Sequence, residues 1–177
     1  GGYQAGDVIQ IRLDASNHVQ YVRNSTVLYT STVVVEDRLV LDFSIYDAGF
    51  TLSDLCWIST TEFVTDAPAE PTDPVVLTAS QNVTVHEDGS ISRPGTANGW
   101  NQSGASSEKT LDPLVPTTAR SVRGFTFRAG TSDKICRIGF TRVRNESDSH
   151  YNDTEFSLEL GATRRLVAYE GHVSKGS

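Results

Sequence analysis

The sequence contains no methionine, not even at its first position, and no hydrophobic leader segment. We therefore expect a processed product, an excised piece or one unit of a longer chain, with any secretion leader outside these 177 residues. No stretch approaches the roughly 18 consecutive apolar residues of a membrane-spanning helix. Membrane insertion is not expected.

Positive charge is also scarce. Lysine and arginine number 15 against 22 aspartate and glutamate residues, which gives a net charge of −7 at pH 7. A protein that binds nucleic acid through phosphate contacts needs a basic surface, so no nucleic-acid partner is expected. Residues 1–60 and 61–74 are acidic, whereas 75–177 are nearly neutral. Head-to-tail association of copies is one interpretation of this asymmetry, and a solvated surface of mixed charge is the simpler one.

Helical periodicity is missing as well. No segment repeats its apolar residues with the 3.6-residue period of an amphipathic helix, and alternation dominates instead. Phe156, Leu158 and Leu160 alternate with polar residues and should face a core. Residues 18–31 predict a β-hairpin that turns at Arg23-Asn24-Ser25. About a dozen short strands joined by Gly, Asn, Asp and Ser turns predict an all-β antiparallel sandwich.

One low-complexity stretch divides the chain. Residues 61–74, TEFVTDAPAEPTDP, combine prolines with acidic residues and little apolar surface. Proline stiffens such a segment and like charges extend it, so we predict a linker between residues 1–60 and residues 75–177. Each flanking part has too few strands to cover its own apolar face, so each needs a partner to complete the sandwich.

Several strand-and-turn motifs occur together. Residues 6–31 read GDVIQIRLDASNHVQYVRNSTVLYTS, residues 97–111 read ANGWNQSGASSEKTL, and residues 151–160 read YNDTEFSLEL. This set resembles the concanavalin A-like jelly-roll modules of secreted and cell-surface proteins, which include lectin- and glucanase-like members. The resemblance implies that residues 1–60 are the C-terminal half of the jelly roll and residues 75–177 its N-terminal half.

The halves would therefore come in permuted order, and two explanations stay open. Under circular permutation, the acidic linker joins the old termini and the sandwich closes within one chain. In a tandem array, residues 1–60 complete the sandwich begun by the preceding unit. The missing methionine and a sequence that starts within a loop favour the array slightly.

N-glycosylation signals are frequent. By composition, chance would place about 1.5 N-x-Ser/Thr sequons in this chain. Five are present, all in or beside predicted turns, at Asn24, Asn82, Asn101, Asn145 and Asn152. We predict covalent N-glycans on these residues and an extracellular or cell-surface location. The alternative is that a chain rich in serine and threonine generates unused sequons.

The chain has two cysteines, Cys56 and Cys136, each inside a predicted strand. A disulfide between them would tie the two halves together and stabilise the fold by roughly 4 kcal/mol. Two buried free thiols are the alternative. The spacing does not suit a zinc site, which needs four ligands.

Catalytic motifs are not found, and no enzyme activity is expected. Asp153, Glu155 and Glu159 would share one face of a strand, but their spacing differs from the paired carboxylates of jelly-roll glucanases. No cofactor is expected. The one metal candidate is Ca²⁺ at the oxygen-rich loop around Asp148, Asn152 and Asp153, which are also common turn residues.

Trp100, between Asn98 and Asn101, could stack on a sugar ring, although a glycan on Asn101 would crowd it. We therefore predict a non-enzymatic extracellular structural glycoprotein, a repeat unit or protomer of a fibrous surface assembly that binds copies of itself. The alternative is a lectin-like carbohydrate-binding or adhesion module.

Overall fold

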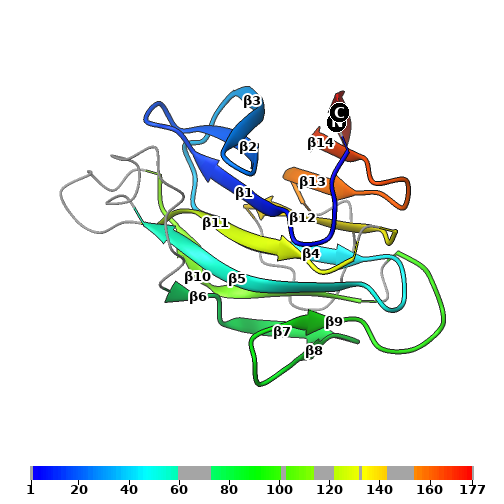
Figure 1. Cartoon of the computed structure of the whole chain (residues 1–177). Helices are drawn as coiled ribbons and strands as arrows, with labels where there is room; N and C mark the ends of the chain where they lie inside the picture. The colour runs from blue at the N-terminus through cyan, green and yellow to red at the C-terminus, as the bar shows by residue number, and fades with distance from the viewer. Residues whose placement is uncertain are drawn as a thin grey trace.

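The computed structural model describes residues 2–59, 73–100, 103–113, 122–131, 133–142 and 154–176. Strands dominate this part of the chain, and it contains no helix (Figure 1). All strand pairs are antiparallel, and the strands form two sheets. The predicted all-β class with antiparallel pairing is therefore confirmed.

The first sheet, called here the β1 sheet, has eight strands. Its order is β3 (Thr26–Val34), β2 (His18–Arg23), β1 (Val8–Leu13), β11 (Val122–Ala129), β5 (Thr51–Ser59), β9 (Ile91–Ser92) and β8 (Thr84–Val85), and β6 (Asp73–Pro74) pairs with β5. Of the predicted linker, only Asp73 and Pro74 are described, and they form the strand β6.

The second sheet, called the β4 sheet, has seven strands. Its order is β15 (Val173–Gly176), β14 (Leu166–Glu170), β13 (Phe156–Leu160), β12 (Cys136–Thr141), β4 (Leu39–Ile45), β10 (Gly104–Leu111) and β7 (Leu77–Gln81). Its strands β12, β13 and β14 lie side by side in Figure 1.

Strands from before and after residues 60–72 alternate in both sheets. β11 lies between β1 and β5, with Ile9 opposite Phe127. β4 lies between β12 and β10, with Phe43 opposite Ile138. Residues 1–60 and 75–177 thus contribute to the same two sheets within one chain.

The β2–β3 hairpin forms where the sequence predicts it, and β3 continues to Val34. Arg23 pairs with Thr26, which leaves Asn24 and Ser25 as a two-residue turn. Both have positive φ, 45° and 69°. Positive φ at both turn residues is the type I′ geometry, whose twist matches that of antiparallel strands.

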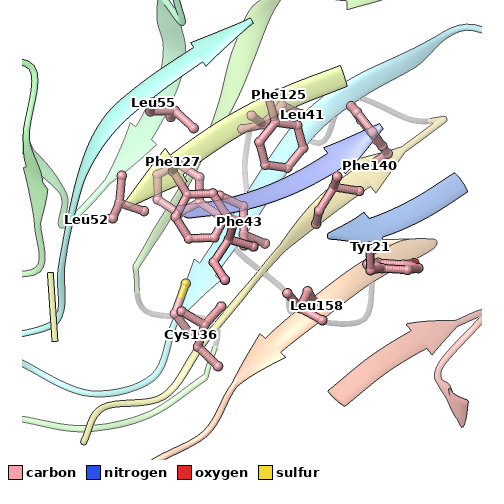
Figure 2. Close-up of a cluster of buried hydrophobic side chains, with 14 of the residues drawn as sticks. Tyr21, Leu41, Phe43, Leu52, Leu55, Phe125, Phe127, Cys136, Phe140 and Leu158 are labelled. Carbon is pink, nitrogen blue, oxygen red and sulfur yellow. The ribbon is translucent and has the colours of Figure 1, made fainter. Parts of the chain in front are cut away.

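The core lies between the sheets and is rich in phenylalanine (Figure 2). Phe43, Phe125, Phe127 and Phe140 are almost fully buried, and the Phe125 and Phe140 rings meet edge to face at 5.0 Å. Phe156, Leu158 and Leu160 also face this core, as their alternation predicts. Burying one such side chain contributes about 1.5–3 kcal/mol, so the core fixes the register that positions the outer faces.

Candidate functional site

The outer face of the β4 sheet collects polar side chains from strands far apart in the sequence. They alternate along each strand with core residues, so they point away from the core. Strand register places them in two neighbouring rows. The first row runs Ser44, Arg137, Glu159, and the second runs Ser106, Asp42, Gly139, Ser157, Tyr169. We call this surface, with the adjoining Tyr46 and Trp100, the Arg137 face.

Arg137 contacts two aromatic rings and a carboxylate on this face. Its Cζ atom lies 4.0 Å from the centroid of the Tyr169 ring and 5.7 Å from that of Trp100. Its Nη2 donates a hydrogen bond to Glu159 Oε2 at 2.7 Å. The guanidinium is therefore neutralised by a carboxylate and held by aromatic rings, a geometry in which a cation–π contact is attractive.

Trp100 owes its position to a buried arginine. The Arg93 guanidinium donates to the backbone carbonyls of Ile45, Tyr46, Ala97 and Gly99. These bonds join the 97–100 segment to the end of β4. The Trp100 ring centroid then lies 5.2 Å from that of Tyr46. Burial lowers the pKa of Arg93, while the nearby Asp47 raises it.

Three serine hydroxyls on the face are buried without using their hydrogen-bonding capacity. Ser44, Ser106 and Ser157 are each 2% exposed or less. Within the part of the chain that is described, none of the three Oγ atoms has a hydrogen-bond partner. Buried hydroxyls are normally paired, because leaving one unpaired costs about 1–3 kcal/mol. Their hydrogen-bonding capacity is unused, and a ligand group reaches them only when the atoms that cover them move aside.

Gly139 leaves a position without a side chain between Asp42 and Ser157 in the second row. A Cβ atom there would lie 1.9 Å from the carbonyl oxygen of Phe156, closer than any side chain allows. The close approach of β13 thus requires glycine, and the middle of the face is backbone.

The sequons are described in part. Asn24 and Asn82 are exposed at turns, as predicted, and both have positive φ. The Asn24 side chain donates to Asp7 Oδ1 and accepts from the Val8 amide. Asn101, Asn145 and Asn152 lie outside the described residues, as do Asp148 and Asp153 of the Ca²⁺ candidate.

The predicted disulfide is not formed, because both cysteines are free thiols. Cys136 belongs to the core between the sheets (Figure 2). Cys56 lies opposite Thr126, which alternates with the core residues Phe125 and Phe127. Cys56 therefore points to the outer face of the β1 sheet, and that sheet's backbone separates the two thiols. Burial raises the pKa of both.

Glu155 and Glu159, two of the three carboxylates compared above with those of jelly-roll glucanases, each bind an arginine. Glu159 accepts from Arg137, and Glu155 forms an ion pair with Arg142 at 3.2 Å. No group of three potential metal ligands occurs among the described residues.

Sequence reasoning identified Trp100 but missed Arg137, Tyr169 and the serines. Alternation along each strand could have shown that Arg137, Tyr169 and the serines point away from the core. These residues come together on one face because strands far apart in the sequence pair, as Ser44 does with Arg137. The sequence of a single strand does not indicate which strand it pairs with.

Comparison of the chain with family models, with curated proteins and with solved structures finds no match. In the described part of the chain, no helix has the length and apolar character needed to cross a membrane. The site is therefore interpreted from its own chemistry.

Proposed function

We propose that the chain is a non-enzymatic carbohydrate-binding module of an extracellular glycoprotein, and that the Arg137 face is its binding surface. One observation carries the proposal. Buried serine hydroxyls without hydrogen-bond partners lie on the same face as the Trp100, Tyr46 and Tyr169 rings. A saccharide offers both complements, hydroxyl groups for the serines and apolar C–H faces for the rings.

The charge of the face favours a neutral saccharide. Arg137 is paired with Glu159, and Asp42 lies one row away. An anionic ligand would have to compete with Glu159 for the guanidinium and would meet Asp42 nearby. The concanavalin A-like resemblance of the strand motifs supports the same class of function, since that family includes lectin-like members.

The test is a glycan array probed with protein made without N-glycans, so that no sugar on Asn101 crowds Trp100. Wild-type protein should bind a neutral oligosaccharide, and Trp100→Ala should weaken that binding at least about tenfold, the loss of one stacking contact. Arg128→Ala, an exposed residue of β11 in the other sheet, is the control and should bind like wild type. Absence of saccharide binding by folded wild-type protein would reject the proposal.

The second candidate is the structural protomer of a fibrous assembly. Its specific support is β3, an edge strand with exposed apolar side chains. A denaturing, reducing intact mass of native material after removal of N-glycans tests it. A mass at a large multiple of 19.3 kDa would support a tandem array, and a single unit would reject the array.

A further inference from the structure

The edge strand β3 is nine residues long and carries exposed apolar side chains. It ends the path of the β1 sheet, so it pairs on one side with β2, and no strand of the described residues pairs with its other side (Figure 1). Six of its nine residues are exposed. Val27, Leu28, Val33 and Val34 have exposed fractions of 44%, 37%, 41% and 46%. These are four of the seven exposed large hydrophobic residues of the described chain.

The other strands that end the paths of the two sheets are shorter than β3. β8 is two residues long, β15 is four residues long with Lys175 in it, and β7 is five residues long. Natural edge strands are commonly short or carry charge, because an open edge invites pairing with another chain. β3 has neither protection, since residues 24–35 contain no charged side chain. Two register shifts against β2 put bulges in β3, which limit the free edge without removing it.

The charges that flank β3 indicate which partner strand would pair with its free edge. Arg23 precedes the uncharged stretch and Glu36 follows it. If two copies of β3 pair antiparallel about a two-fold axis, the Arg23 end of one copy meets the Glu36 end of the other. Parallel pairing would instead bring like charges together. The uncharged centre also lets two copies, each with net charge −7, approach where repulsion is weakest.

We propose that β3 is a self-association edge, at which it pairs antiparallel with β3 of a second copy to form one continuous sheet across a symmetric dimer. This interface is independent of the Arg137 face, which lies on the other sheet. It differs from head-to-tail association, because the same strand serves both copies.

The test is the mass of the full chain in solution, made without N-glycans because Asn24 lies at the hairpin end of β3. Sedimentation over a range of concentrations should show a dimer of twice 19.3 kDa. Leu28→Lys should raise the dimer dissociation constant at least about tenfold, since the lysine charge would enter an apolar interface. The control Val85→Lys, an exposed valine of β8, should leave it unchanged. Monomeric wild type at every concentration, or equal effects of both variants, would overturn the proposal.

A charge exchange tests the antiparallel geometry without touching the apolar centre. Arg23→Glu and Glu36→Arg should each weaken the dimer, because each places like charges at both ends of the paired strands. The double variant restores opposite charges and should recover the wild-type dissociation constant. A double variant no tighter than the singles would contradict antiparallel pairing of β3 with itself.

Discussion

Arg137 and Tyr169 meet across the outer face of the β4 sheet, with the Arg137 Cζ atom 4.0 Å from the centroid of the Tyr169 ring. The two residues lie on β12 and β14, and Glu159 on the intervening β13 accepts a hydrogen bond from the same guanidinium. One cation thus links three adjacent strands and holds a ring in place at the proposed sugar site.

The Arg137–Tyr169 contact predicts a difference between two substitutions. Tyr169→Phe keeps the ring and should leave the free energy of unfolding nearly unchanged. Tyr169→Ala removes the cation–π contact and should lower the free energy of unfolding by about 1–2 kcal/mol. Denaturant unfolding of both variants measures the difference. Equal losses would mean that the ring does not stabilise Arg137.

Substitution of Ser157 should lower saccharide affinity without lowering the stability of the fold. Its buried hydroxyl bonds no other described group, so Ser157→Ala should leave the melting temperature unchanged or raise it, while saccharide affinity falls. Ser103→Ala is the matched control, because the equally buried Ser103 donates to the Asn82 carbonyl at 2.9 Å. The control should lose about 1 kcal/mol of stability and keep its affinity. The reverse pattern would show that Ser157 is a structural residue.

Gly139→Ala should be among the most harmful small changes, because its Cβ would overlap the Phe156 carbonyl oxygen. We expect a loss of about 3 kcal/mol or more, measured by denaturant unfolding. In the control Gly161→Ala, the new Cβ lies 3.5 Å from its nearest neighbour, the Arg165 carbonyl oxygen. That variant should remain close to wild type. A stable Gly139→Ala variant would contradict the close approach of β12 and β13.

The state of the cysteines predicts a thiol count. Under denaturing conditions without reductant, two thiols per chain should react with a thiol reagent, because Cys56 and Cys136 are free. In the native protein Cys136 should be protected, because it is fully buried in the core. A count of zero in the denatured, unreduced chain would restore the disulfide predicted from the sequence.

Alkaline pH should destabilise the fold. Burial raises the pKa of Cys136 well above its ordinary 9.0 and that of Tyr21 well above 10.0. The unfolded chain releases the Cys136 proton as pH rises through 9.0 and the Tyr21 proton as pH rises through 10.0, while the folded chain keeps both, so the free energy of unfolding falls as pH rises. Melting temperatures between about pH 8 and 11 should show this fall, and Cys136→Ala should make it shallower. An identical slope for this variant would exclude Cys136 as a source.

Features of the fold and of the candidate site that depend on neighbouring residues could be predicted from the sequence, whereas features that depend on contacts between distant segments could not. The alternation of Phe156, Leu158 and Leu160 assigned these residues to the core, and Asn24-Ser25 marked a turn, which positive φ at both residues confirms. These signals are local. The pairing of β4 with β12, and the Arg93 hydrogen bonds to the carbonyls of Ile45 and Tyr46, join segments separated by tens of residues. Even Cys56 and Cys136 were placed in the right strands, but the faces of those strands depend on register.

The most direct test of the saccharide-binding claim is an NMR titration of the isotope-labelled chain with the best saccharide from the array. The account predicts that the amide signals of Ser44, Gly139 and Ser157 shift together with the Trp100 indole signal. Signals of the outer face of the β1 sheet, such as those of Gln20 and Thr126, should stay in place. Shifts confined to the β1 sheet, or no shift with any saccharide, would contradict the assignment of the Arg137 face as a carbohydrate-binding surface.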